Sequence, residues 1–309
     1  MNGILNINKP RGKTSFSIVA TVKRLTGERR VGHAGTLDPE AEGVLPICLG
    51  QGTRVVEFLV DTTKAYRAQI ELGVATDTYD SSGQITQQGD PSEVTHRQLS
   101  SALTSFCGLI QQTPPMYSAV KHQGKRLYEL ARAGIKVERR SRPAKIYHLK
   151  LIDWQPPVVT IEVVCGQGTY IRCLAHDLGQ ILGCGANLKN LIRLRCGPFD
   201  IKDTVSLTQL EDASRYGYWQ YFVHPIDIVL LDWAAIIVND EKSQLIKNGR
   251  PLTLEGSVSG REIDYSRVYS VAGSSFENRC RVYNLDGCFL GVLRFNPESR
   301  QWRPEKVFV

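Results

Sequence analysis

The segment Gly32–Pro39, with the sequence GHAGTLDP, holds the residues best suited to chemistry in this chain. Its two glycines allow the backbone to come close to a ligand. Pro39 stiffens the chain directly after Asp38 and disfavours the α region for that aspartate. A carboxylate held on such a turn can be presented to a bulky substrate. The same pattern is also typical of an Asx turn, in which Asp38 only caps the backbone.

The sequence lacks the standard motifs of nucleotide, redox and hydrolase chemistry. It contains no G-x-x-x-x-G-K-S/T loop and no G-x-G-x-x-G turn. It also contains no G-x-S-x-G elbow and no H-E-x-x-H pair. The eight cysteines are never two to four residues apart, which does not fit a zinc site. We therefore expect no cofactor and no metal, and free thiols in a reducing compartment.

The positive charge of the chain is concentrated in one segment. The net charge is +7, from 38 basic and 31 acidic residues. Residues 121–150 hold ten basic and two acidic residues, so they carry +8 and the rest of the chain carries −1. Such a patch is typical of a surface that binds nucleic acid. The alternative is a solvated charged face.

The elements that must position Asp38 follow from local patterns. Thr14 or Ser15 is expected to cap a helix that ends at Gly27. Residues 64–72 alternate in polarity, which predicts a half-buried strand. Strands are also expected at 3–8, 146–154 and 158–164, and helices at 125–133, before Gly183, and after capping boxes at Thr95–Gln98 and Ser206–Gln209.

Strands and helices mix without regular βαβ alternation, which favours the α+β class over a doubly wound sheet. After His224-Pro225 the chain changes to short strands and turns. We place a domain boundary near residue 229 and expect a small β-barrel in residues 229–309. The longest apolar stretch, Ile226–Val238, contains two aspartates and is too short for a membrane span. No secretory signal is evident at the start, so a cytoplasmic location is expected.

Several motifs occur in the order of a known family. The segments are NKPRGKTS, GHAGTLDP with GVLPICLG, KAYRAQIELG, TDTYDSSG, QQTPPMYSAVKHQGKRLYELARAGIKVERRSRPAKI, CGQGTYIRCLAHDLG and LIRLRCGPF. Together they cover most of residues 3–200, and they resemble the TruB family, the bacterial tRNA pseudouridine-55 synthases. The resemblance implies isomerisation of one uridine in the T-arm of tRNA to pseudouridine.

The resemblance also implies a fold and an assignment of domains. The fold is the pseudouridine synthase fold, a mixed, mostly antiparallel sheet with flanking helices. Residues 1–228 would form the catalytic domain, with a segment that grips RNA at 112–150. Residues 229–309 would form a PUA-type RNA-binding domain, although the motifs match only loosely there.

The site residues follow from the same motif matches. Asp38 matches the catalytic aspartate, and Arg172 matches the arginine paired with it. Tyr66 matches the tyrosine that stacks on the target base and is proposed to help remove a proton. The residues expected to bind substrate are Tyr170, Leu191, His33, Lys9, Arg139, Arg140 and Arg142.

The implied reaction agrees with the missing cofactor motifs, because it is redox-neutral and involves no net hydrolysis. Asp38 could attack C1′ or C6 of the uridine, or assist an elimination. Burial would raise the pKa of its carboxyl group, and Arg172 would oppose that rise. The target base must be flipped out of the folded loop.

Two other functions are considered, a non-catalytic RNA-binding or RNA-folding protein and a glycoside or nucleoside hydrolase that uses Asp38 with Glu40. The expected partner is the T-arm of tRNA, for a monomer that needs neither a membrane nor a protein partner.

Overall fold

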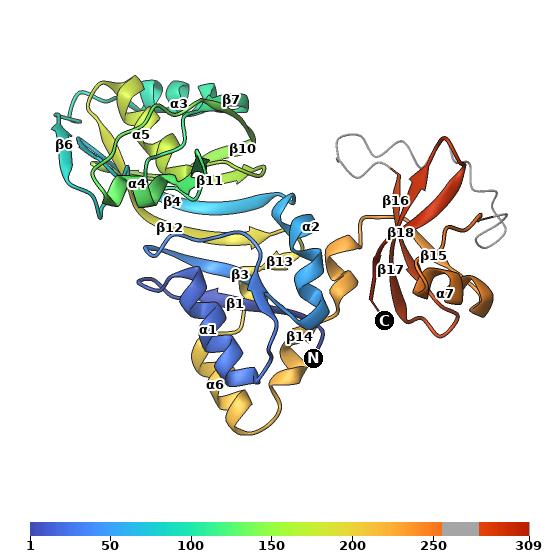
Figure 1. Cartoon of the computed structure of the whole chain (residues 1–309). Helices are drawn as coiled ribbons and strands as arrows, with labels where there is room; N and C mark the ends of the chain where they lie inside the picture. The colour runs from blue at the N-terminus through green and yellow to red at the C-terminus, as the bar shows by residue number, and fades with distance from the viewer. Residues whose placement is uncertain (255–277, 309) are drawn as a thin grey trace. The chain divides into compact units, whose positions relative to one another are not determined.

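The structure is a computed structural model that describes residues 1–254 and 278–308 (Figure 1). It divides into two compact units. The first comprises Met1 and Gly3–Val223, and the second comprises Asn2 and His224–Val309. The boundary expected near residue 229 falls inside η4 (Ile226–Leu230), a short 3-10 helix of the second unit.

One mixed sheet forms the centre of the first unit. Its strands lie in the order β1 (Gly3–Lys9), β3 (Ala41–Leu49), β12 (Ala186–Cys196), β4 (Lys64–Leu72), β11 (Val158–Cys165), β10 (Arg142–Gln155) and β7 (Gly108–Gln112). Along this order neighbours pair antiparallel, except β3 and β12, which run parallel. This sheet confirms the predicted α+β class.

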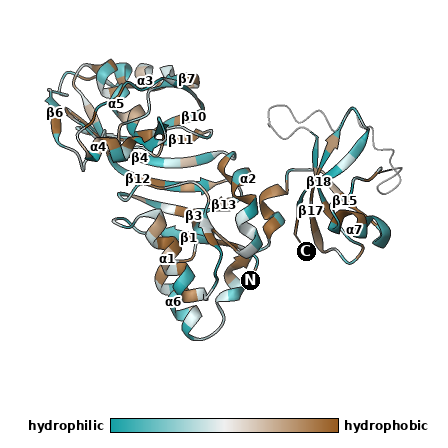
Figure 2. Ribbon diagram, viewed as in Figure 1, coloured by the Kyte–Doolittle hydropathy of each residue, from teal (hydrophilic) through white to brown (hydrophobic). Residues whose placement is uncertain are grey.

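Two hydrophobic cores pack against the sheet. The first includes Leu99 of α3 (His96–Ser105) and Leu174 of α5 (Ile171–Leu182). The second includes Ile18 of α1 (Ser15–Thr26) and Leu210 of α6 (Leu207–Arg215). Figure 1 shows α3 and α5 beside β10 and β7, and α1 and α6 beside β1. Figure 2 shows hydrophobic and hydrophilic residues side by side around α1 and α6, as expected of helices buried on one side.

The helix boundaries follow from the predicted caps. The Thr14 side chain accepts a hydrogen bond from the backbone N–H of Ser17, and Gly27 ends α1 in the left-handed conformation with φ 71°. Both predicted capping boxes are present, at the starts of α3 and α6. These local signals are sufficient because the partners of each cap lie within one helical turn.

Strand β4 has the predicted bounds, whereas β10 begins four residues earlier than expected, at Arg142. Strand β12 is not anticipated by the sequence pattern. It lies between β3 and β4 in the middle of the sheet and is interrupted by polar residues such as Lys189, Asn190 and Arg193. A buried strand is normally recognised by an unbroken apolar run, and this one has none.

The parallel junction of β3 and β12 brings two backbones very close together. Gly43 of β3 pairs with Arg193 of β12. A Cβ atom on Gly43 would lie 2.4 Å from the Arg193 carbonyl oxygen, and its φ is 101°. Only glycine fits there.

The remaining elements of the first unit are short. They are β2 (Val31–His33), η1 (Gly50–Val55), α2 (Val56–Val60), β5 (Val74–Thr76), β6 (Ile85–Gln88), β8 (Lys121–His122), β9 (Lys125–Arg126), α4 (Leu127–Arg132), β13 (Phe199–Asp200), η2 (Ile201–Asp203) and η3 (Trp219–Phe222); β14 (Val223–His224) lies at the boundary. The helix predicted at 125–133 is therefore present in a shorter form, as α4.

The described part of the second unit contains a four-stranded sheet and one α-helix. The strands lie in the order β15 (Ala235–Ile237), β16 (Arg279–Tyr283), β17 (Phe289–Asn296) and β18 (Gln301–Val307). Helix α7 (Asp240–Lys247) contributes Ile246 to its core, which also contains Val282 and Trp302. The predicted β-rich unit is therefore present as a sheet. Residues 255–277 of the expected barrel lie outside the described residues.

Candidate active site

Asp38 lies on the loop between β2 and β3, and several hydrogen bonds hold this loop. The Ser15 hydroxyl donates to the carbonyl of Leu37 (3.0 Å) and accepts from its N–H (2.9 Å). The Gly12 N–H donates to the Pro39 carbonyl (2.8 Å). The N-terminal end of α1 and the segment before it therefore fix the backbone on both sides of Asp38.

Arg172 stands opposite Asp38, in the first turn of α5. Its Nε lies 3.0 Å from Oδ2 of Asp38. The arginine side chain is 6% exposed, whereas 40% of the Asp38 side chain is open to solvent. The arrangement places a buried permanent cation behind a carboxylate that an incoming molecule can reach.

The other donors of Arg172 bind two further segments. Its Nη2 donates to the Tyr117 carbonyl (2.8 Å), and its Nη1 donates to the Thr78 carbonyl (3.3 Å). Nη1 also lies 3.5 Å from Oδ2 of Asp80. The bonds of Nη1 and Nη2 hold the guanidinium between these segments, and its Nε faces Asp38 as an ion pair.

Asp80 is a site residue that the sequence reasoning did not single out. It is buried, and its Oδ1 accepts hydrogen bonds from the N–H of Ser82 (3.0 Å) and the hydroxyl of Thr78 (2.8 Å). These bonds leave Oδ2 for Arg172. The available signal was the motif TDTYDSSG, in which the aspartate is flanked by residues that form turns.

The residue before Asp80 is held by a ring contact. Tyr79 has φ 66°, an uncommon conformation for a non-glycine residue. Its ring stacks on His176 with the centroids 3.9 Å apart and the planes at 16°. His176 lies one turn after Arg172 on α5, so the same helix binds the loop at both residues.

The electrostatics of Asp38 combine opposing effects. Burial raises the pKa of its carboxyl group, and the nearby charge of Asp80 adds to that rise. Arg172 and Lys9 oppose it. The net direction is upward, so the ionised form of Asp38 is disfavoured relative to an ordinary aspartate.

Tyr66 and Leu191 lie where the two cores of the first unit meet, since each contacts both. Tyr66 is on β4 opposite Arg193 of β12, and Leu191 is opposite Ala68. Burial raises the pKa of Tyr66 to about 12, so its hydroxyl is protonated at neutral pH. The two predicted residues are thus neighbours on adjacent strands.

Tyr170 is the residue before α5, and a buried glutamine holds its backbone. Gln112 accepts from the Tyr170 N–H (2.9 Å) and donates to the Tyr170 carbonyl (3.2 Å). Burial raises the pKa of the Tyr170 hydroxyl, and the nearby Ser118 side chain opposes the rise. Together with the Tyr117–Arg172 bond, these contacts tie residues 112–118 to the start of α5.

Lys9, which is predicted to bind substrate, contacts the Asp38 loop from the protein interior. It is fully buried, and its Nζ donates to the carbonyls of Pro10, Pro39 and Ala41. Burial lowers its pKa to about 8. The ammonium group therefore holds the Asp38 loop from inside, and in this arrangement it offers no surface to a phosphate.

His33 ends β2 and is half-buried, with a lowered pKa caused by burial and by the charge of Arg193. Its Nδ1 is buried and has no hydrogen-bond partner among the described residues. Nδ1 of the neutral His33 ring is therefore a buried polar atom without a hydrogen bond to the described residues.

Two family models and several named relatives match this chain. The family model "TruB family pseudouridylate synthase (N terminal domain)" matches residues 23–171, and "tRNA pseudouridylate synthase B C-terminal domain" matches residues 172–230. The tRNA pseudouridine synthase B of Dehalococcoides mccartyi is 43% identical over all of this chain and 97% of that protein. That of Clostridium perfringens is 38% identical over all of this chain and 99% of that protein.

This chain belongs to the TruB family. It is therefore a tRNA pseudouridine synthase, which is an isomerase, as the motifs predicted. A chain in the crystal structure of a Cbf5–Nop10–Gar1 complex superposes with a TM-score of 0.73 at 25% identity, over 99% of this chain and 85% of that one. The match confirms the fold expected of a TruB-family enzyme.

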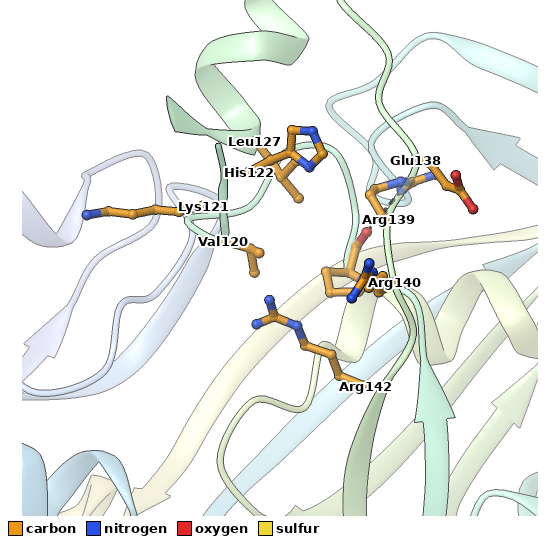
Figure 3. A pocket seen from close by; sticks show the side chains of 9 residues that line it. Val120, Lys121, His122, Leu127, Glu138, Arg139, Arg140 and Arg142 are labelled. Carbon is orange, nitrogen blue, oxygen red and sulfur yellow. Dashed lines mark hydrogen bonds between the residues drawn. The ribbon is translucent and has the colours of Figure 1, made fainter. Parts of the chain in front are cut away.

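The basic segment of this TruB-family chain forms a pocket of about 170 Å³. The pocket has an apolar side that includes Val120 and Leu127, and its basic lining residues are Lys121, His122, Arg139, Arg140 and Arg142. Figure 3 shows Arg142 directed toward Val120, while Lys121 and Glu138 extend away in opposite directions.

The three predicted arginines of this segment differ in exposure. Arg140 and Arg142 are exposed, whereas Arg139 is half-buried and donates to the Pro114 carbonyl (3.0 Å). Arg139 therefore faces the protein, and the other two face solvent. The positive charge of Arg139 also lowers the pKa of His176 on α5, after the larger effect of burial.

The potential metal ligands, the thiols and Glu40 of this TruB-family chain complete the description of its reactive groups. Residues 1–254 and 278–308 hold no cluster of three or more potential metal ligands. All eight cysteines are free thiols, six of them buried. Glu40, the second carboxylate of the hydrolase alternative, is paired with Arg11 at 2.8 Å. No helix in the described ranges is long and apolar enough to cross a membrane.

Proposed function

We propose that this enzyme converts uridine 55 in the T-arm of tRNA to pseudouridine, with Asp38 as the carboxylate that activates the nucleoside. The observation that supports this most directly is the 3.0 Å ion pair between Asp38 and the buried Arg172. The pair presents an accessible carboxylate on a rigid loop. That geometry suits covalent or elimination chemistry at a ribose carbon, because the attacking group is already positioned.

In the proposed reaction the N1–C1′ bond breaks and a C5–C1′ bond forms. The proton on C5 leaves, and N1 of the rotated base takes up a proton, so the product is an isomer of the substrate. Asp38 acts by attack at C1′, by attack at C6, or by assisting elimination. Arg172 favours the ionised carboxylate, which opposes part of the effect of burial on its pKa, and limits its rotation.

Tyr66 is the proposed platform for the flipped base. Stacking of a base on an aromatic ring contributes about 1–3 kcal/mol, which offsets part of the cost of unstacking it from the RNA. Leu191 on the adjacent strand supplies an apolar contact next to this ring. Tyr170 and His33 complete the proposed surroundings of the nucleotide.

The T-arm phosphates are proposed to lie against the basic pocket, with Arg140 and Arg142 as the exposed cations. Binding there releases counterions, so the affinity falls steeply as salt is added. Arg139 acts indirectly, because it binds Pro114 of the segment that reaches Arg172.

The decisive test is the position of pseudouridine in a tRNA that starts unmodified. Purified protein is incubated without additives with a transcript and with the same transcript carrying cytidine at position 55. We expect pseudouridine at position 55 in the first transcript and none in the second. Modification at another position would refute the proposed specificity.

The role of Asp38 is tested with Asp38→Asn, with Glu40→Gln as the matched control on the same loop. The first variant should bind tRNA and make no pseudouridine, and the control should remain active. Wild-type turnover by Asp38→Asn would refute the mechanism. Release of free uracil would favour the hydrolase alternative. Scoring base modification separates catalysis from an RNA-folding role, in which binding alone would suffice.

We also propose that the enzyme acts as a cytoplasmic monomer without a protein partner, and that residues 229–309 form a PUA-type domain that contacts tRNA. Sedimentation of the free protein and of its tRNA complex tests the stoichiometry. Truncation after residue 228 tests the contribution of the C-terminal unit to tRNA affinity.

A further inference from the structure

Arg193 occupies an unusual position in the middle of the central sheet. It lies on β12, two residues after Leu191, and is 1% exposed. Its Nε donates to the Val44 carbonyl (2.7 Å), and its Nη2 donates to the Gly35 carbonyl (3.0 Å). Both acceptors belong to the stretch of chain that carries Asp38, one before it and one after it.

The same guanidinium also reaches the proposed base platform. Arg193 and Tyr66 are directly opposite each other on β12 and β4. The Arg193 side chain lies close enough to the Tyr66 hydroxyl to lower the pKa of Tyr66 against the larger effect of burial. One side chain therefore links Tyr66 to the loop of Asp38.

Stability alone does not account for this residue. Arg193 forms no ion pair with any carboxylate in residues 1–254 and 278–308. An arginine is always protonated, and a buried charge without a counter-ion costs several kcal/mol. An apolar side chain of similar size would suit the interior of the sheet better on energetic grounds. A functional demand on the site explains why the charge is present.

We propose that Arg193 is a positioning residue for the isomerisation, which holds the Tyr66 hydroxyl and the Asp38 loop in one fixed arrangement. The proposal rests on the proposed function of Asp38 and Tyr66. Arg193 acts through these two residues and does not itself contact the reacting atoms. The fork of the guanidinium is essential, because it places Nε on the Val44 carbonyl and Nη2 on the Gly35 carbonyl at once, whereas a lysine has one terminal nitrogen in place of two separate donors.

The test is a double-mutant cycle on the single-turnover rate, using Arg193→Lys, Tyr66→Phe and the double variant with a tRNA transcript. Arg193→Lys should lower the rate about tenfold or more, with tRNA affinity and melting temperature close to wild type. In the Tyr66→Phe background the same change should lower the rate much less. Arg195→Lys, an exposed arginine on the same strand, is the control and should leave the rate unchanged.

A second variant covers the case in which Arg193→Lys does not fold. A Cβ atom on Gly35 would lie 3.3 Å from Nη1 of Arg193, and Gly35 has φ 80°, so Gly35→Ala presses on the guanidinium and also strains the loop that it binds. This variant should reduce the rate in the wild-type background more than in the Tyr66→Phe background.

Two results would overturn the inference while the wild-type enzyme remains active. One is a wild-type rate in Arg193→Lys, or in Gly35→Ala where that variant replaces it. The other is a pair of rate losses that add fully in the cycle. An inactive wild-type protein would instead refute the proposed function.

Discussion

Asp80 has two effects on the site: it forms an ion pair with Arg172, and its charge raises the pKa of Asp38. The variant Asp80→Asn should separate them. Asp80→Asn is a clean perturbation because Oδ1, which accepts from Ser82 and Thr78, can be kept as the amide oxygen. Only the ion pair of Oδ2 with Arg172 is lost. The arginine keeps its contacts with Asp38 and with the carbonyls of Thr78 and Tyr117.

The expected magnitude follows from the length of the contact. A hydrogen bond to a charged group contributes about 1.5–3 kcal/mol. At 3.5 Å this bond is long, which favours the lower value. If the contact supports the active arrangement, a loss of about 1.5 kcal/mol corresponds to a rate about tenfold lower at neutral pH.

Although Asp80→Asn should be slower at neutral pH, it should keep its activity to lower pH than wild type. Asp80 raises the pKa of Asp38, so its removal lowers that pKa. The carboxylate then stays ionised to lower pH, and the acid limb of the rate profile shifts downward. A slower enzyme whose activity extends to lower pH is therefore the signature of this variant.

The assay is the single-turnover release of tritium from C5 of uridine in a labelled transcript, measured across pH with tRNA affinity determined in parallel. Asp77→Asn is the matched control, because Asp77 is on the same loop and caps the Gln84 N–H without reaching Arg172. An unchanged rate in Asp80→Asn, or an acid limb shifted upward, would refute the reasoning. A loss confined to tRNA affinity would refute it as well.

Four further predictions concern Asp38, the parallel junction and the basic pocket. Because the pKa of Asp38 is raised, the wild-type rate should begin to fall at a higher pH than an ordinary aspartate would cause, and a pH–rate profile checks this. The raised pKa also makes the stability of the protein depend on pH. The stabilising contribution of protonated Asp38 is fully present below its unfolded pKa and is lost as pH rises through its folded pKa. At neutral pH the uncharged Asp38→Asn variant should therefore have a higher melting temperature than wild type. Gly43→Ala should lower the free energy of unfolding by more than about 3 kcal/mol, because its Cβ would clash with the backbone of Arg193. Gly12 also has a positive φ but has nothing within 4 Å of its Cβ position, so Gly12→Ala should lower the free energy of unfolding by about 1 kcal/mol. Urea unfolding of both variants distinguishes a backbone clash from conformational strain. Arg140→Gln and Arg142→Gln should each reduce the slope of log affinity against log salt by about 1, and an unchanged slope would remove that arginine from the phosphate contacts.

The sequence was sufficient for features whose partners are close along the chain. The caps of α1 and both capping boxes involve residues three or four positions apart, and the alternation of 64–72 is a property of one strand. The motif matches added the residues of the site, because residues of a family motif can be matched without knowing how folding brings them together. In this way Asp38 and Arg172 were predicted together, although 134 residues separate them, and the structure places them 3.0 Å apart.

The tertiary structure decided what depends on contacts between distant segments. Strand β12 was missed because its polar residues are accommodated by partners that are distant in sequence, such as Glu71 and Gln69 of β4 and Val44 of β3. Lys9 was predicted to bind substrate, and only the structure shows that its ammonium donates to carbonyls of the loop that carries Asp38. Asp80 and Arg193 gained their roles only when folding brought them to Arg172 and Tyr66. Burial and pairing are properties of the folded chain, and they determine whether a charged side chain faces solvent, a substrate or the protein itself.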